Sequence, residues 1–376
     1  MSDPLTVLEG GSLNRWMSGC VRAFERHRGA IDAINVFPVA DSDTGTNLLL
    51  TLRSAMDATL RLTSHPTASE AIAAIASGAL AGARGNSGVI VSQWLRGLAE
   101  AATGRRLIDV AVLQAGLRRA LELARTAVSN PEPGTVLTVL QRVHEAVRHR
   151  ADSAAAPPTL AELSALAVDT ARTALRETTG ALAALRAAGV VDAGAAGLVI
   201  VLQELDAVIA GASPGGSRLP EGLDAGAVAV TPPYRAGAEL LAVREGGSVE
   251  YGYEVMYLLE ENARTAAGPA AEKLSATLRV LGDCVSVVSD GGALWTVHVH
   301  CDDIGAAIEA GLQYGNPSRI TVSRFADQAH RRPARFDSER AVVTLARGAG
   351  IARLFRSAGA AVLALPEGTT PRPSDL

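Results

Sequence analysis

The stretch Asn35-Val-Phe-Pro-Val-Ala-Asp-Ser-Asp-Thr-Gly-Thr-Asn47 lies directly before an apolar run with helical spacing. It places Asp41 and Asp43 one residue apart in a turn-forming segment. Mg²⁺ prefers oxygen ligands and is usually bound by a few carboxylates together with nucleotide phosphates, and the N–H groups at a helix start bind the same phosphates. The stretch therefore predicts a magnesium and nucleotide site at a helix N-terminus. An Asp-rich turn that only caps the helix is the alternative.

The segments on both sides of this stretch have the apolar periodicity of helices. Apolar residues recur at helical spacing before it, which predicts an amphipathic helix over residues 12–28. Strand-like alternation is nearly absent up to residue 211, so residues 1–211 are predicted to form one all-helical domain, an eight-helix bundle or barrel. The other seven helices are expected over residues 46–62, 69–82, 87–102, 108–128, 135–151, 159–186 and 193–210.

The composition changes after residue 211. Residues 212–233 are rich in Gly and Pro and are predicted to form a linker. Residues 234–332 follow the order strand, helix, strand, strand, helix, strand, which predicts an α+β domain of the βαββαβ type. Residues 333–376 contain a strand, a helix over 350–357 and a strand, too few to bury a core, so we expect an incomplete C-terminal α/β segment.

Charge and cysteine content exclude several classes of protein. The net charge of -4 disfavours a non-specific nucleic-acid binder, which is normally basic. The three cysteines are odd in number and far apart, which predicts a reducing, cytoplasmic location rather than a disulfide framework. The first residues lack the basic and apolar regions of a signal peptide, and no apolar run is long enough to predict an integral membrane protein.

Three further helix starts carry polar residues or glycine. A Gly-rich turn over residues 82–88 contains Gly85, Asn86 and Ser87 and leads into a predicted helix, so its backbone N–H groups are suited to bind phosphate. The other two starts contain Thr135 with Thr138, and Asp192 with Gly194. Each of the three would also be explained by an ordinary helix cap. Four such starts in one bundle favour convergence on a single anion.

These four motifs, in this order, resemble the kinase domain of the bacterial fatty acid kinase catalytic subunit, which is homologous to the ATP-binding subunit of dihydroxyacetone kinase. The resemblance continues at Tyr251-Gly-Tyr-Glu, Leu281-Gly-Asp-Cys, His298-Val-His300 and Tyr314-Gly. It implies an eight-helix barrel that binds ATP with two Mg²⁺ ions at one end. Two positions depart from the family pattern: Ala40 stands where proline is usual, and Ser42 where glycine is usual.

The resemblance also implies a role for each motif residue. Asn35, Asp41 and Asp43 would be magnesium ligands, and the two aspartates would serve catalysis through the metal rather than as acid or base. Thr46 and Asn47 would contact phosphate, and the remaining motif residues would complete the nucleotide site. Among these, Gly85, Asn86 and Ser87 would form the second phosphate turn, Thr135 and Thr138 would line the pocket, and Asp192 with Gly194 would close it.

His298 and His300 alternate on a predicted strand, so their side chains should project from one face of the sheet. The resemblance implies a zinc site that pairs these two histidines with a cysteine, but this chain has Glu254 at the cysteine position. Glutamate can bind Zn²⁺, and Cys284 or Cys301 could substitute, although Cys301 should point to the opposite face. Two histidines packed on a sheet without metal are the alternative.

The function implied by the resemblance is transfer of the ATP γ-phosphoryl group to a fatty acid carboxylate, giving an acyl phosphate. A separate DegV-type fatty-acid-binding protein would present the fatty acid, and the kinase would be a homodimer. Two other readings stay open at this point. One is a dihydroxyacetone-type kinase for a small polyol, and the other is a catalytically impaired nucleotide-binding protein with a regulatory or scaffold role.

Overall fold

The computed structural model describes residues 3–37, 42–128, 131–153, 156–219, 251–261, 270–325, 343–347 and 361–365. By its internal contacts the chain divides into two compact units, Met1–Phe325 and Ala326–Leu376. The predicted helix over 350–357 lies outside the described residues, as do Ala40 and Asp41. No helix among the described residues is long and apolar enough to cross a membrane.

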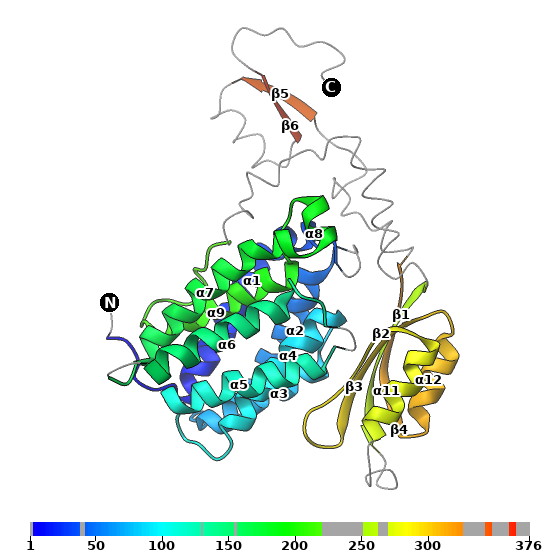
Figure 1. Ribbon diagram of the computed structural model, residues 1–376, viewed down its shortest axis with the longest axis horizontal. Helices are drawn as coiled ribbons and strands as arrows, with labels where there is room; N and C mark the ends of the chain where they lie inside the picture. The colour runs from blue at the N-terminus through cyan, green and yellow to red at the C-terminus, as the bar shows by residue number, and fades with distance from the viewer. Residues whose placement is uncertain are drawn as a thin grey trace. The chain divides into compact units, whose positions relative to one another are not determined.

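The N-terminal part of the first unit is all-helical up to residue 209 in the described residues (Figure 1). The helices are α1 (Gly10–Ala33), α2 (Thr44–Thr59), α3 (Ala68–Ala81), α4 (Gly85–Ala101), α5 (Val110–Thr126), α6 (Val136–Ser153), α7 (Leu160–Ala181), α8 (Ala183–Ala188) and α9 (Ala193–Ile209).

One predicted helix is two. The single helix expected over 159–186 is interrupted at Leu182, whose backbone is extended. Gly180, which has a low helix propensity, lies just before the break, and its carbonyl accepts a hydrogen bond from the Arg186 guanidinium. The prediction of one helix there was therefore wrong, and the short α8 turns the chain towards α9.

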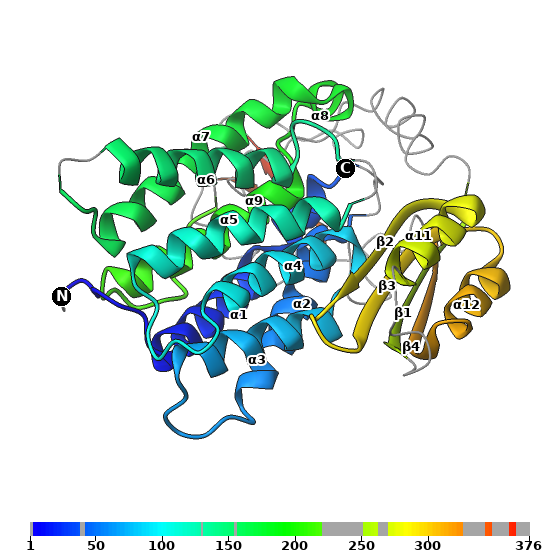
Figure 2. The same ribbon diagram turned by 60° about the horizontal axis from the view of Figure 1, so that its bottom comes forward.

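The long helices pack in a closed cycle. Each of α1 to α7 packs against the next helix in the chain, α7 packs against α9, and α9 returns to α1 (Figure 2). Apolar residues surround α9, so it is buried along almost its whole length, as expected for a helix without a polar face. The rings of Trp16 and Trp94 meet edge to face in the core, with centroids 6.1 Å apart. This packing holds the starts of α2, α4, α6 and α9 in fixed positions.

The predicted linker begins as a structured segment. The buried carboxylate of Glu204 on α9 accepts hydrogen bonds from the backbone N–H groups of Gly215 and Ser217. On α1, the Arg22 guanidinium donates to the Pro214 carbonyl over 2.8 Å. Residues 212–219 therefore lie against α1 and α9, and the remainder of the predicted linker lies outside the described residues.

A four-stranded antiparallel sheet follows in the same unit, with the strand order β2-β3-β1-β4. This is the split-βαβ arrangement, in which β3 lies between β1 and β2. Helices α11 and α12 cover one face, where Val255, Tyr257 and Val297 are buried. The elements are β1 (Tyr253–Glu261), α11 (Ala270–Leu281), β2 (Gly282–Ser289), β3 (Leu294–Cys301), α12 (Ile304–Leu312) and β4 (Gly315–Arg324).

The opposite face of the sheet lies against α3 and α4. The Thr296 hydroxyl on β3 donates to the Leu80 carbonyl over 3.0 Å, and Met256 and Val288 pack on Leu80 and Val89. At the end of β2, the Arg96 guanidinium donates to the Ser289 carbonyl over 2.6 Å. These contacts bring the sheet face to the start of α4.

The second unit contains two described strands, β5 (Val343–Arg347) and β6 (Ala361–Leu365), which pair in parallel. Parallel neighbours require a crossover connection between them. β5 and β6 overlap the two strands that apolar runs predict over residues 341–346 and 360–365.

Close packing of α4 on α5 leaves no room for a side chain at Gly97. A Cβ at Gly97 would lie 2.2 Å from the Ala120 backbone nitrogen on α5, whereas a Cβ at Gly29 on α1 would meet nothing within 4 Å. We expect Gly97→Ala to lower the free energy of unfolding by about 1 to 3 kcal/mol, because the methyl group forces the two backbones apart. Gly29→Ala should raise it by about 0.5 to 1 kcal/mol through helix propensity alone.

Chemical denaturation followed by circular dichroism measures both variants. Equal stability of Gly97→Ala and Gly29→Ala would contradict the close approach of α4 and α5.

Candidate nucleotide and metal site

One pocket of the first unit gathers residues that are far apart in the sequence. Its walls come from the end of α1, the start of α2, the start of α4 and the face of the sheet. The lining residues are Asn35, Asp43, Thr44, Asn47, Gly85, Asn86, Ser87, Glu254, His298 and His300. The pocket therefore contains the described magnesium candidates, most of the phosphate candidates and all three zinc candidates.

The start of α2 is held by a carboxylate on α1. Asp43 is the residue before the helix, but its side chain makes no capping hydrogen bond. Instead the Asp32 carboxylate accepts from the Thr46 backbone N–H over 3.0 Å and from the Thr46 hydroxyl over 2.8 Å. Burial raises the pKa of Asp32 above its ordinary value, although these hydrogen bonds oppose the rise. Asp32 thus ties the two ends of the predicted metal loop together.

This contact changes the surroundings of Thr46. Its hydroxyl donates to Asp32, and Thr46 is not among the residues that line the pocket, whereas its neighbour Asn47 is. Asp32 was not predicted as a site residue, because a carboxylate in the last turn of a helix has no distinguishing pattern.

The start of α4 depends on Gly85. Its φ of +54° lies in the left-handed region, and a Cβ there would be 2.7 Å from the Asn47 Nδ2 atom. A glycine is needed for both reasons. The Gly85 N–H points to the Met256 sulfur on β1 at 3.3 Å, and the Arg84 guanidinium donates to the Thr321 hydroxyl on β4 over 3.0 Å. The predicted phosphate turn therefore touches both α2 and the sheet.

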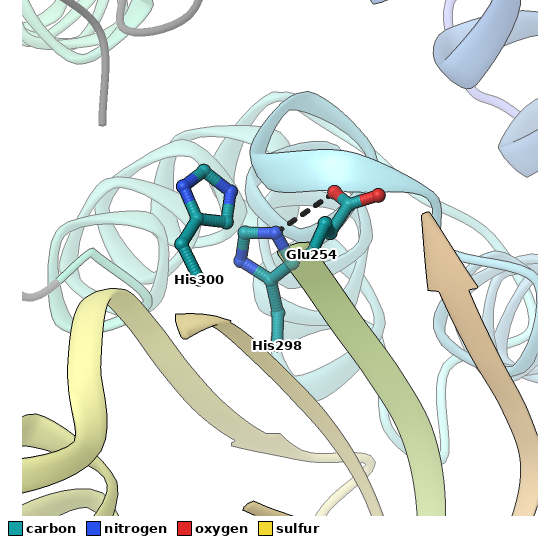
Figure 3. A group of neighbouring side chains, drawn as sticks. All are labelled: Glu254, His298 and His300. Carbon is teal, nitrogen blue, oxygen red and sulfur yellow. Dashed lines mark hydrogen bonds and ion pairs between the residues drawn. The ribbon is translucent and has the colours of Figure 1, made fainter. Parts of the chain in front are cut away.

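His298 on β3 is oriented by two hydrogen bonds, of which Figure 3 shows the one to Glu254. Its Nδ1 lies 3.0 Å from the Cys284 carbonyl oxygen, and since a carbonyl can only accept, Nδ1 carries a proton. Its Nε2 lies 3.0 Å from the Glu254 carboxylate. Burial alone would raise the pKa of Glu254, but the hydrogen bond from His298 and the charges of both histidines outweigh burial and lower it.

His300 is also buried in this cluster. Its ring packs edge to face on His298 and on Phe325, with centroid distances of 4.9 and 4.8 Å. Burial lowers the pKa of His300 more than the neighbouring Asp283 raises it. Glu254, His298 and His300 have ligand atoms within 4.8 Å of one another, and so do Asp283, Cys284 and His300. His300 therefore belongs to two groups that could hold a metal ion.

Two family models match the chain. Residues 38–207 match the DAK2 domain, and residues 250–332 match the middle domain of the FakA-like fatty acid kinases. Protein YloV of Bacillus subtilis is 30% identical over 385 residues, which cover 98% of this chain and 67% of YloV. The chain belongs to the FakA-like fatty acid kinase family.

For other relatives, this chain matches a smaller share of the relative's length. An uncharacterized protein of Staphylococcus epidermidis is 30% identical over 362 residues, covering 92% of this chain and 62% of that protein. The chain thus spans about two thirds of the length of these curated relatives. Among solved structures, the dihydroxyacetone kinase from C. freundii in complex with AMP-PNP and Mg²⁺ gives a TM-score of 0.38 at 20% identity, covering 54% of this chain and 34% of that one.

The remaining predicted residues form a second group in this family member, at the starts of α6 and α9. The Thr138 hydroxyl accepts from the Gly134 N–H over 2.8 Å, and the Thr135 hydroxyl donates to the Glu132 carbonyl over 2.9 Å. Neither threonine lines the pocket described above, nor do Asp192 and Gly194. Their contact with a nucleotide stays a prediction.

Asp192 joins α6 to α9. Its buried carboxylate accepts from the Ala195 N–H over 2.8 Å and from the backbone of Val136, the first residue of α6. Burial raises the pKa of Asp192 to about 6, and the two backbone hydrogen bonds offset only part of that effect. Asp192 is therefore a structural cap whose charge has an energetic cost.

This raised pKa predicts a pH-dependent stability. The pKa of Asp192 is about 6 in the folded chain and 3.8 ordinarily, so the folded state holds the proton more tightly. The contribution of Asp192 to stability is then greatest below pH 4 and falls as the pH rises to about 6, by about 3 kcal/mol. Asp192→Asn cannot titrate and should lack this fall.

Denaturant unfolding of both proteins at pH 4 and pH 7 measures the effect. The wild type should lose stability relative to Asp192→Asn by about 2 kcal/mol between the two pH values, because the unfolded chain is already partly ionised at pH 4. The same stability difference between the two proteins at both pH values would show that burial does not raise the pKa of Asp192.

Proposed function

We propose that this protein is an ATP-dependent kinase that phosphorylates a fatty acid carboxylate to give an acyl phosphate. The fatty acid would be presented by a separate DegV-type fatty-acid-binding protein. The observation that supports the proposal most directly is the shared pocket, in which Asn35 and Asp43 meet the Gly85–Ser87 turn. Membership of the FakA-like fatty acid kinase family supports the choice of acceptor.

The donor atoms in the pocket suit magnesium. Asn35 and Asp43 offer amide and carboxylate oxygens, which are the hard ligands that Mg²⁺ prefers. Asp41, which lies outside the described residues, would join them. ATP bound together with Mg²⁺ would supply the phosphoryl group. The chain contributes the ligands that hold the Mg²⁺ charge beside the phosphates, and neither aspartate acts as acid or base.

The phosphates would lie between the starts of α2 and α4. Asn47 and the turn Gly85, Asn86 and Ser87 line the same wall of the pocket, and the missing side chain at Gly85 leaves room for close approach. Two helix N-termini add partial positive charge there. Thr46 would help only indirectly, because its hydroxyl donates to Asp32 and so holds the start of α2 in position. Thr135, Thr138, Asp192 and Gly194 would complete the nucleotide site.

A carboxylate acceptor suits the chemistry of the pocket. A carboxylic acid with a pKa of about 4 to 5 is ionised at neutral pH, so no general base is needed. Phosphoryl transfer then depends mainly on positioning and charge neutralisation. Glu254, His298 and His300 line the side of the pocket formed by the sheet, where an incoming carboxylate would meet the phosphate. Zinc bound by these three residues stays a prediction, and their ligand atoms lie within 4.8 Å.

One observation favours a second candidate function. A small polyol such as dihydroxyacetone must lose a proton when its hydroxyl attacks phosphorus, and the Glu254 carboxylate, which is hydrogen-bonded to His298 in the same pocket, would accept that proton. The carboxylate acceptor remains our first choice because the sheet belongs to the FakA-like middle domain. A homodimer and a cytoplasmic location are further expectations.

The magnesium assignment is tested with Asp43→Ala and Asp41→Ala. Both variants should bind ATP at least about tenfold more weakly in the presence of Mg²⁺, because a direct metal ligand is lost. Asp57→Ala changes an exposed carboxylate on the same helix and should leave affinity unchanged. Calorimetric titration with ATP, with and without Mg²⁺, measures the affinities, and circular dichroism confirms folding. Unchanged affinity in both site variants would refute the assignment.

The acceptor is identified by the product. The full chain is incubated with labelled ATP, Mg²⁺ and a fatty-acid-loaded DegV-type protein, and acyl phosphate is trapped with hydroxylamine. The proposal predicts a hydroxamate that requires all three components. Turnover only with dihydroxyacetone would favour the polyol kinase, and ATP binding without any turnover would favour a regulatory or scaffold protein.

A further inference from the structure

Strand β2 contains an irregularity beside the histidine cluster. The pairing of β2 with β3 shifts register between Asp283 and Ser286, and Cys284 within this interval has a φ of +50°. A non-glycine residue in the left-handed region is uncommon and persists only where the surroundings hold it. Bulges of this kind re-aim side chains and are frequent beside active sites. The irregularity therefore changes where Cys284 points.

The consequence is that two consecutive residues reach the same partner. In a regular strand Asp283 and Cys284 would project from opposite faces. Here Asp283 is paired with His300 across the strands, and the ligand atoms of Asp283, Cys284 and His300 all lie within 4.8 Å of one another. The Cys284 thiol also interacts with the Asn86 side chain in the phosphate turn. A thiol, a carboxylate and an imidazole thus converge next to the pocket.

The two histidines differ in the hydrogen bonds that their ring nitrogens make. Both nitrogens of His298 have partners at 3.0 Å, the Cys284 carbonyl and the Glu254 carboxylate. His300 Nδ1 has no hydrogen-bond partner among the described residues, although the side chain is only 4% exposed, and the nearest carboxylate oxygen of Asp283 is 3.5 Å away. A buried imidazole nitrogen without a partner is costly unless something else binds it.

We propose that Asp283, Cys284 and His300 bind a divalent transition-metal ion such as Zn²⁺. Sulfur, nitrogen and carboxylate donors suit zinc, whereas Mg²⁺ takes oxygen ligands. The ion would bind His300 Nδ1, and the bulge at Cys284 would supply the thiolate, with its proton released to solvent on binding. This donor set shares only His300 with Glu254, His298 and His300, so the two sets are alternatives for a single ion.

Three protein ligands leave one coordination position of a tetrahedral zinc ion for an external ligand. The Cys284 thiol contacts Asn86 of the phosphate turn, so the proposed ion would lie beside that turn. The external ligand would be an oxygen of a carboxylate or a phosphate, the two groups that the proposed kinase reaction brings together. The metal site itself does not depend on that reaction, because binding of the ion is measured without nucleotide.

Cobalt substitution tests the donor set in the full chain. The protein is stripped of metal with a chelator and titrated with Co²⁺, and the near-ultraviolet absorption from thiolate-to-cobalt charge transfer is recorded. The wild type should bind one Co²⁺ with this band, and Zn²⁺ should displace it. Cys284→Ser should lose the band and weaken Co²⁺ binding at least about tenfold, and Asp283→Asn should weaken binding while keeping the band.

Two controls separate this site from its neighbours. Cys301→Ala removes a thiol buried on the helix-covered side of the sheet and should keep the band. Glu254→Gln should keep both the band and the affinity. A band that survives in Cys284→Ser, metal binding abolished by Glu254→Gln alone, or no Co²⁺ binding by folded wild-type chain would each overturn the proposal. Mg²⁺-dependent ATP binding is a separate measurement, so failure of the metal site and failure of the kinase assignment are distinguishable.

Discussion

The contact between the sheet and helices α3 and α4 determines what the pocket contains. The sheet buries one face under α11 and α12, and its other face carries apolar side chains such as Met256 and Val288, which pack on Leu80 and Val89. A hydrogen bond from Thr296 to the Leu80 carbonyl at 3.0 Å sets the position of the sheet on the helices. Because β3 carries both Thr296 and the two histidines, covering the apolar face also brings the histidines to the phosphate turn.

The helical part contributes rigid helix starts to the same place. The Asp32 carboxylate fixes the first turn of α2, and Gly85 allows the first turn of α4 to lie against Asn47. Neither Asp32 nor this packing at Gly85 is proposed to bind a substrate, yet each fixes the position of a residue that is predicted to bind magnesium or phosphate. Asp192 joins α6 to α9 in a similar way, although burial raises its pKa to about 6. The bundle accepts a costly buried carboxyl there because two backbone N–H groups at helix starts need an acceptor.

The helices and strands themselves were predictable for particular reasons. Apolar spacing indicated α2 and α9 to within three residues at each end and α1 except for its last five residues, and alternation indicated β1 and β3. The helix over 159–186 was mispredicted because the break at Leu182 depends on a single extended residue after a glycine, which periodicity cannot detect. The bulge in β2 was not foreseen either, since nothing in the sequence Gly-Asp-Cys-Val distinguishes it from a regular strand.

By itself, the sequence determined the types of the elements, the four polar helix starts and the pair His298 and His300, because each is a local pattern of residue spacing. Only the tertiary structure decided that Asn35 and Asp43 share a pocket with residues more than 200 positions away, such as Glu254. It also decided that Thr46 bonds to Asp32 and that Cys284 faces His300. The physical reason is that these contacts depend on how apolar faces are buried against one another, and spacing along the chain does not specify which faces meet.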